Sequence, residues 1–189
     1  MIVRRPRTKA TDLPPSTDGI IRVDSMNVLG IILQKDLSFQ DHAERLASQC
    51  AQNLYALKTL RSHGLAGPQL WDVTKATLVS RISYASQAWW GLLDAGSRNR
   101  LEACLNKVKK QGFLPPSHPS FTEICDKADD VLFSAVLHNP HHVLHPLLPP
   151  VKTATYNLRP RAHNRVIPND KNTIFRKTFI MKMLNLNSY

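Results

Sequence analysis

Between Ser38 and Pro140, apolar residues recur three or four positions apart in four successive stretches. This spacing places apolar side chains on one face of an α-helix, and that face must be buried against other helices. Residues that commonly begin or end helices separate the stretches, among them Gly64, Gly67, Pro68, Asp94 and Gly112. The sequence therefore predicts a mainly α fold built around a small bundle of about four helices.

Polar residues mark where several of these helices begin. Ser38 followed by Asp41 resembles a capping box for the first helix, Asp94 can cap the third, and Ser120 with Glu123 forms a full capping box for the fourth. The second helix is predicted to open at Gly67 and Pro68 and to carry one apolar face: Trp71, Thr74, Leu78, Ile82, Ala85 and Trp89. We therefore expect Trp89 in the core. Trp90 is expected about 100° further around the helix, against a second surface.

The two ends of the chain differ from this helical middle. Residues 20–33 hold two short β-rich runs on either side of Asp24–Asn27, which predicts a β-hairpin. Residues after His145 are rich in Pro and Arg and lack a helical period, which predicts an extended basic arm with a short helix or strand in 172–187. The predicted segments are 1–33 (basic segment and hairpin), 34–145 (helical bundle) and 146–189 (basic arm).

The net charge of +11 lies at the two ends of the chain. Residues 1–11 contribute +4 and residues 152–189 contribute +7, so residues 12–151 are neutral overall. Basic arms attract polyanions, of which nucleic acid is the commonest, although an acidic protein would respond to the same field. The charge therefore favours nucleic acid as a partner and leaves a protein partner open.

Other features of the composition exclude several classes of protein. Cys50, Cys104 and Cys125 are odd in number and form no C-x-x-C motif, which argues against a disulfide framework and favours a reducing compartment. No apolar run is long enough to span a membrane, and the Arg-rich start lacks the apolar region of a signal peptide. We expect an intracellular protein, nuclear or cytoplasmic, without membrane association.

The sequence contains no complete catalytic or metal-binding motif. Asp129 and Asp130 are adjacent within a predicted helix, where we expect them on a solvated face beside Lys127. Spacings of three and four residues could let a histidine group hold zinc on one helical face, but Pro140 interrupts the helix. The group comprises His138, His141, His142 and His145. We expect no catalytic residue, no metal and no cofactor.

Basic residues instead form the candidate binding site. Arg159, Arg161 and Arg165, with His163 between them, could hold phosphates and stack on an unpaired base, or could form only a solvated tail. The other candidates close the first and third helices: Lys58, Arg61, His63, Lys107, Lys109 and Lys110. Cations at the carboxyl end of a helix also complement its dipole, so that explanation stands beside a nucleic-acid groove.

Several blocks, in order, resemble the carboxyl-terminal part of reverse transcriptases of non-LTR (LINE-like) retrotransposons. The blocks are "VLGIILQKDLSFQDHAERLASQCAQNLYALKTLRSHGL", "LVSRISYASQAWWGLL", "RLEACLNKVKKQGF", "HHVLHPLLPP" and "YNLRPRAHNR". The resemblance implies that Val28, Leu29 and Gly30 correspond to the primer grip and that the following helices correspond to the thumb of an RNA-directed DNA polymerase. It also implies binding to RNA, DNA or an RNA–DNA hybrid through phosphates.

The catalytic palm of that family, with its metal-binding aspartates, would precede the primer grip, and the sequence contains no match to it. Two-metal phosphoryl transfer needs those carboxylates, so we expect no polymerase activity from this chain alone. The chain resembles a truncated or decayed transposable element, translated from an internal methionine. Two alternatives remain: a helical module for self-association or protein binding, including the missing palm, and a segment similar to the amino-terminal domain of an AlkB-type homologue.

Overall fold

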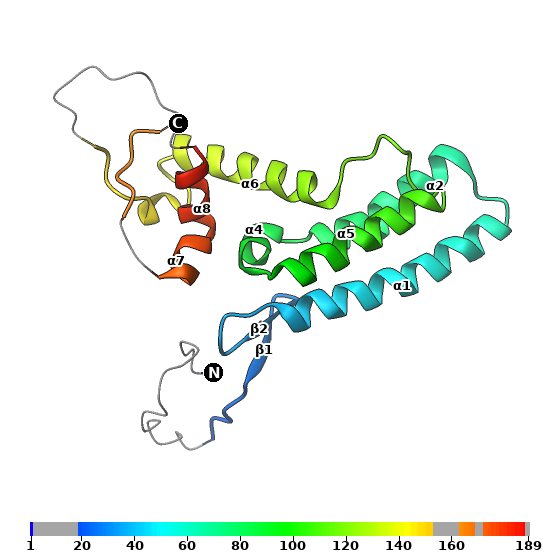
Figure 1. Ribbon diagram of the computed structural model, residues 1–189, viewed down its shortest axis with the longest axis horizontal. Coiled ribbons are helices and arrows are strands. Elements are labelled where there is room, and N and C mark those ends of the chain that lie inside the picture. Colours follow the sequence, from blue (N-terminus) through cyan, green and yellow to red (C-terminus); the bar gives the residue numbers. More distant parts are fainter. Residues whose placement is uncertain (2–18, 153–162, 169–171, 188–189) are drawn as a thin grey trace. The chain divides into compact units, whose positions relative to one another are not determined.

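The computed structural model describes Met1 and residues 19–152, 163–168 and 172–187 (Figure 1). As predicted, the fold is mainly helical, with a two-stranded antiparallel hairpin followed by several helices. The chain divides into two compact units. Unit one comprises Met1–Ile82 and Leu92–His118, and unit two comprises Ser83–Gly91 and Pro119–Tyr189.

The hairpin of unit one consists of β1 (Ser25–Val28) and β2 (Ile31–Gln34), in which Val28 pairs with Ile31. The sequence placed the break between the runs at Asp24–Asn27, but the turn is formed by Leu29 and Gly30. Both turn residues have a positive φ, of 50° and 88°, as the tight turns of two-residue hairpins require. The hairpin was therefore predicted correctly, whereas its turn was placed about four residues too early.

Three of the predicted helices have the expected ends. Helix α1 (Gln40–Ser62) is followed by Gly64, and α5 (Ala95–Lys110) begins at an Asp94 cap that accepts a hydrogen bond from the Ser97 amide. Helix α6 (Phe121–His138) starts with the predicted capping box of Ser120 and Glu123. The capping box predicted for α1 does not form. Buried Phe39 occupies the cap position there, and Ser38 Oγ, one residue earlier, accepts a hydrogen bond from the Gln40 amide at 3.3 Å.

The second predicted helix is not continuous. It runs through α2 (Gly67–Thr74), a π-helical turn η1 (Lys75–Val79) and α3 (Ser80–Ser83). Ala85 then adopts a left-handed conformation with φ of 48°, which ends the helix before α4 (Ser86–Trp89) and the short η2 (Trp90–Leu92). Because helical spacing continues across this break, the apolar pattern could not reveal it.

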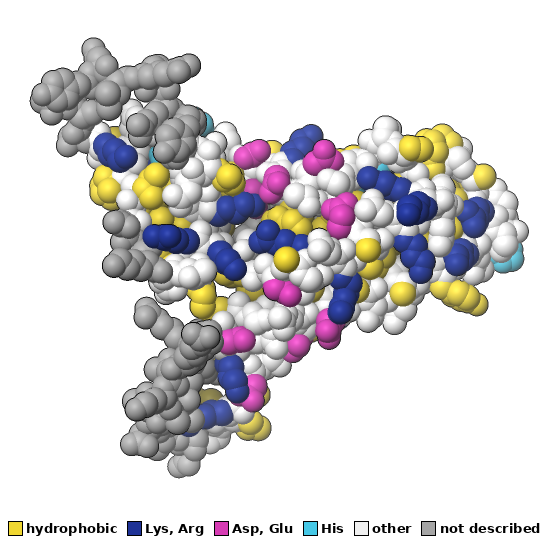
Figure 2. All heavy atoms as spheres, in the orientation of Figure 1, with side chains coloured by type: hydrophobic (Ala, Val, Ile, Leu, Met, Phe, Trp, Pro, Cys, Tyr) yellow, Lys and Arg dark blue, Asp and Glu magenta, His cyan; other side chains and the backbone are white. Residues whose placement is uncertain are grey.

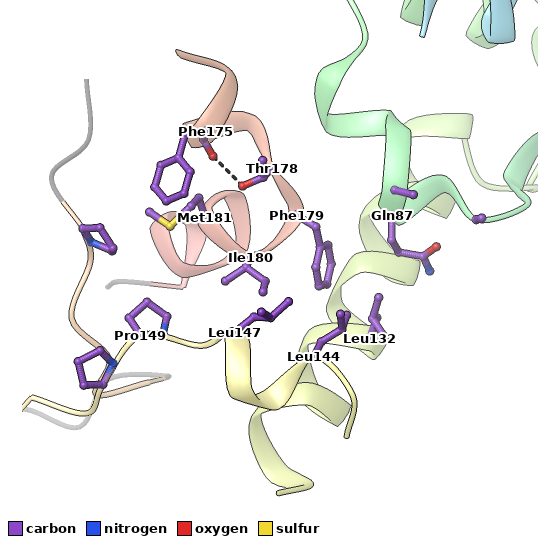
Figure 3. A pocket seen from close by; sticks show the side chains of 14 residues that line it. Gln87, Leu132, Leu144, Leu147, Pro149, Phe175, Thr178, Phe179, Ile180 and Met181 are labelled. Carbon is purple, nitrogen blue, oxygen red and sulfur yellow. Dashed lines mark hydrogen bonds between the residues drawn. The ribbon is translucent and has the colours of Figure 1, made fainter. Parts of the chain in front are cut away.

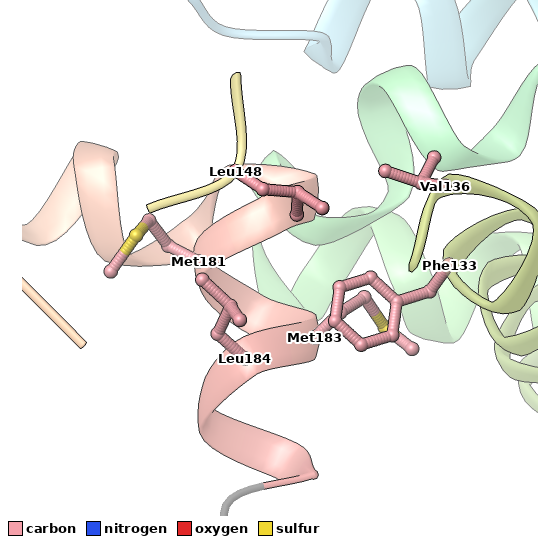
Figure 4. Close-up of a cluster of buried hydrophobic side chains, with 6 residues drawn as sticks. All are labelled: Phe133, Val136, Leu148, Met181, Met183 and Leu184. Atoms are coloured by element: carbon pink, nitrogen blue, oxygen red, sulfur yellow. The ribbon is translucent and has the colours of Figure 1, made fainter. Parts of the chain in front are cut away.

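The core of unit two lies between α6 and the carboxyl-terminal helices (Figure 4). Helices α7 (Thr173–Lys177) and α8 (Phe179–Leu186) come after a short η3 (His145–Leu147) in the chain. Six buried side chains form a cluster here: Phe133, Val136, Leu148, Met181, Met183 and Leu184. The terminal element predicted in residues 172–187 is therefore helical and contributes directly to the core.

Each of the two units is formed by stretches that are separate in the sequence. Residues 83–91 leave the first helices and join unit two, because Trp89 and Trp90 of this stretch both contact Phe121 of α6. Residues 163–168 and 172–187 belong to unit two as well, and they include half-buried and buried side chains. None of the described helices is long and apolar enough to cross a membrane.

Candidate nucleic-acid interface

Helices α1 and α5 of unit one lie against each other in parallel. Three side-chain contacts set their register, and each advances along both helices. A salt bridge of 3.2 Å joins Glu44 Oε1 to Arg100 Nη1 near the start, and the Cys50 and Cys104 thiols share a hydrogen bond further along. At the far end, Arg61 Nη1 donates to the backbone carbonyl of Gln111 at 2.8 Å. The carboxyl ends of both helices therefore meet.

The residues that follow α5 make contacts that stabilise this end of unit one. Gly112 has a φ of 78°, which suits the residue after a helix, and its carbonyl accepts a hydrogen bond from the indole nitrogen of Trp71 at 3.2 Å. The guanidinium of Arg61 lies over the ring of Phe113, 4.5 Å from the ring centre. A guanidinium has five N–H donors, so the bond to Gln111 uses only part of the hydrogen-bonding capacity of Arg61. This arginine both stabilises the fold and carries charge.

Parallel packing brings six predicted binding residues to one end of unit one. Figure 2 shows several Lys and Arg side chains near one another where α1 and α5 end. Five of the six are exposed and Lys109 is half-buried; together they are Lys58, Arg61, His63, Lys107, Lys109 and Lys110. The sequence has no acid in residues 45–71 or 103–122. The basic charge at this end is therefore not offset within either segment.

The helix dipoles account for only part of this charge. Each helix end carries roughly half a negative charge, so two adjacent carboxyl ends amount to about one. Against it stand the formal charges of five Lys and Arg side chains at the ends of α1 and α5. Dipole compensation thus leaves a clear positive excess, which can act on phosphates.

The pKa of Cys104 is lowered mainly by its neighbour Cys50 and in part by nearby positive charge. The hydrogen bond with the Cys50 thiol lowers the pKa of Cys104 to about 7, and the charges of Lys107 and Arg100 lower it further against the effect of burial. The same hydrogen bond, together with burial, raises the pKa of Cys50. Cys104 is thus the group of the pair that ionises first.

The structure places the remaining predicted residues elsewhere. His163 is buried in unit two, where its Nε2 donates to the Leu184 carbonyl at 2.9 Å and its ring meets Phe133 edge-on. Arg165 is half-buried and donates to the carbonyl of Pro149 at 3.0 Å. Arg159 and Arg161 lie outside the described residues. The described part of the predicted arm therefore turns its histidine toward the core.

The hairpin tip carries Val28, Leu29 and Gly30, the residues for which the sequence resemblance predicted a primer grip, and all three are exposed. Leu29 is 85% exposed, and Ile21, before the hairpin, is 84% exposed. The described residues therefore leave Leu29 and Ile21 largely uncovered.

Three of the four histidine rings around Pro140 bond to backbone atoms of nearby residues. His138 Nδ1 donates to the Ser134 carbonyl and His145 Nδ1 to the Val136 carbonyl, both at 2.8 Å, while His142 Nδ1 accepts from the Leu144 amide. Within the described residues, no three His, Cys, Asp or Glu side chains are placed to hold a metal ion.

The sequence did not predict the parallel packing of α1 and α5. The spacing of apolar residues showed that α1 and α5 were helices, but it did not show that they run parallel. The signal that could have indicated a shared site is the absence of acids from both residues 45–71 and residues 103–122.

No protein-family model matches the chain, and neither a curated protein nor a solved structure is similar to it at a significant level. The function must therefore be argued from the residues and their geometry.

Proposed function

We propose that this chain is a thumb-like, nucleic-acid-binding segment related to the reverse transcriptases of non-LTR retrotransposons. The observation that carries the proposal is the meeting of the α1 and α5 carboxyl ends, which gathers Lys58, Arg61, Lys107, Lys109 and Lys110 at one end of unit one. The ordered blocks of sequence resemblance support the same assignment.

The interface would bind template–primer duplex through its phosphates, without reading base edges. Lysine is a flexible point charge, and arginine adds a planar fork, so both suit phosphate oxygens. Phosphate contacts position a protein on a duplex but carry no sequence information. The proposal therefore assigns sequence-independent binding, and it assigns no polymerisation to this chain alone.

Salt dependence of binding tests the proposal. We expect the chain to bind a fluorescent RNA–DNA hybrid at low salt, with log K falling linearly against log salt because each neutralised phosphate releases counterions. Fluorescence anisotropy at several salt concentrations measures the slope. An absence of binding at low salt, or binding that does not change with salt, would contradict it.

A matched pair of variants on α1 locates the interface. Lys58→Glu should weaken binding of every hybrid sequence alike and reduce the salt slope by about one. Arg45→Glu changes the charge equally on an exposed position of the same helix, distant from its carboxyl end. If both variants weaken binding to the same degree, overall charge rather than the helix ends explains the affinity.

Self-association is a second candidate function, favoured by the exposed apolar side chains around the hairpin. These side chains are Ile20, Ile21, Val23, Met26, Val28 and Leu29. Sedimentation velocity should then show mass increasing with concentration, and Ile21→Asp should restore the monomer. A wild-type chain that stays monomeric at high concentration would exclude this candidate.

A further inference from the structure

Unit two contains a large apolar groove that the proposed nucleic-acid function does not use. Its volume is about 870 Å³, and α6, the segment 144–150 and the pair α7 and α8 form its walls (Figure 3). Leu132 faces it from α6, Leu147 from the turn, and Phe179 and Ile180 from α8. The described residues that line it include no charged side chain.

The polar side chains of the lining already make hydrogen bonds to the protein. Thr178 Oγ1 donates to the carbonyl of Phe175 at 2.7 Å, and Gln87 Nε2 donates to the carbonyl of Ala128 at 3.3 Å. The other described lining residues are Ala, Leu, Pro, Phe, Ile or Met. An occupant therefore gains free energy mainly by burying apolar surface.

The apolar surface extends further along α6. A second hollow, of about 500 Å³, shares Gln87 and Leu132 with the groove and continues over Ile124, Val131 and Ala135. Val131 is 65% exposed although it is apolar. An elongated apolar surface of this kind suits the face of a helix, whose side chains recur every three or four residues, better than a compact small molecule.

The surroundings of the groove are basic. Arg176 and Lys177 are exposed and stand between the lining residues Phe175 and Thr178, while Arg165 donates to the carbonyl of the lining residue Pro149. On α6, Lys127 lines the second hollow and Asp130 is exposed, while Asp126 and Asp129 are paired with Lys182. The charge at the rim is thus complementary to an acidic occupant.

We propose that this groove binds the apolar face of an acidic amphipathic helix from a partner protein. The partner would place Leu- or Phe-like side chains, one helical turn apart, against Leu147, Phe179 and Ile180. Its Asp and Glu residues would lie near Arg176 and Lys177 at the rim. The groove shares no residue with the basic ends of α1 and α5, so the proposal does not rest on nucleic-acid binding.

Three fluorescent peptides of equal length test the proposal with the full chain. The first has a leucine face and glutamates elsewhere, the second has the same composition in scrambled order, and the third has lysine in place of glutamate. Fluorescence anisotropy should show the first binding at least about tenfold more tightly than either of the others. The scrambled peptide controls for charge alone, because it keeps every glutamate.

Two variants that each introduce a glutamate test whether the peptide binds in the groove. Leu147→Glu places a charge on the groove wall and should weaken binding of the first peptide at least about tenfold. Val143→Glu makes the same change at a nearby position that is 84% exposed and is not among the described lining residues, so affinity should stay within about twofold. Circular dichroism checks that both variants are folded.

Several outcomes would overturn the proposal. They are the absence of binding by the first peptide, equal binding of the ordered and scrambled peptides, tighter binding of the lysine peptide, and unchanged binding by Leu147→Glu. A wild-type dimer that Leu147→Glu separates into monomers would instead assign the groove to a second copy of the chain.

Discussion

Trp89 and Trp90 are adjacent in the sequence, and both rings pack against Phe121. The Trp89 ring stacks on it with centroids 6.4 Å apart, and the Trp90 ring meets it edge-on at 5.3 Å. Trp89 Nε1 donates to the carbonyl of Tyr84 at 3.1 Å, which satisfies the polar group of a fully buried indole. The expectation that Trp89 lies in the core is confirmed. Trp90 is buried as well, so neither ring is exposed as a platform for a base.

Replacement of Trp90 tests this role. Trp90→Ala should lower the free energy of unfolding by roughly 3–5 kcal/mol, because it leaves a cavity beside Phe121. Urea denaturation measures the loss, and Tyr84→Ala, at a side chain that is 56% exposed, should change stability by no more than about 0.5 kcal/mol. A stable Trp90→Ala variant with weakened nucleic-acid binding would restore the stacking role.

Thiol reactivity tests the electrostatics around Cys104. Its pKa is lowered to about 7, so the thiolate fraction, and with it the rate of alkylation, should rise through neutral pH instead of near the ordinary value of 9.0. Burial raises the pKa of Cys125 to about 12, so that thiol should remain unlabelled at pH 7. Mass spectrometry after brief iodoacetamide treatment reports each site. A midpoint near 9 at Cys104 would contradict the hydrogen bond with Cys50 and the smaller effect of the Lys107 and Arg100 charges.

At the scale of elements, a buried ion pair joins α6 to α8. Lys182 Nζ lies 2.8 Å from Asp129 Oδ2 and 3.1 Å from Asp126 Oδ1, and the Asp129 side chain is only 3% exposed. The sequence predicted Asp129 on a solvated helix face beside Asp130. That prediction holds for Asp130, which is exposed, and is wrong for Asp129, because α8 covers this turn of α6. Burial raises the pKa of Asp129 in spite of the bond to Lys182.

Replacing Lys182 with an uncharged residue should lower the stability of unit two, because the buried Asp129 would lose its partner. Lys182→Met should destabilise unit two by roughly 3 kcal/mol at pH 7, because an ionised Asp129 would remain buried and unpaired. Lys177→Met, at an exposed position, is the control and should have little effect. Urea denaturation followed by a probe in unit two measures both variants.

The pH dependence of this variant follows from the direction of the Asp129 shift. A carboxyl whose folded pKa is raised binds protons more tightly in the folded state, so stability increases as pH falls toward that pKa. Lys182→Met should therefore lose less stability at pH 5 than at pH 7, relative to the wild-type chain. An equal loss at both pH values would show that Asp129 does not carry the effect.

At the scale of the whole molecule, the two proposed sites belong to different units. The basic helix ends lie in unit one, and the apolar groove lies in unit two. The two sites share no residue, and effects of independent substitutions usually add. The two binding activities should therefore be separable.

Two variants, one at each site, are each titrated with both ligands to test whether the two binding activities are separable. The variant carrying both Lys107→Glu and Lys110→Glu should lose affinity for the RNA–DNA hybrid and keep its affinity for the acidic amphipathic peptide. Leu147→Glu should do the reverse. Anisotropy titrations of both ligands against both variants measure the four affinities. If either variant weakens both ligands alike, the sites are coupled or the variants have lost structure.

The sequence by itself determined most of the secondary structure. The hairpin and the starts of α5 and α6 depend on interactions between residues near in sequence, such as the cap from Asp94 to Ser97 and the box of Ser120 and Glu123. Local signals failed where a tertiary contact competed with them. Buried Phe39 occupies the cap position of α1, and the left-handed Ala85 interrupted a helix whose apolar spacing continued unbroken.

Only the tertiary structure decided which residues form the candidate sites. Periodicity identifies the apolar face of a helix but contains no information about the direction of its neighbour. The parallel contact of α1 with α5, which gathers the bases, and the cover of Asp129 by Lys182 both depend on residues about 50 positions apart. Such pairings arise from side-chain packing in three dimensions, which no local pattern encodes.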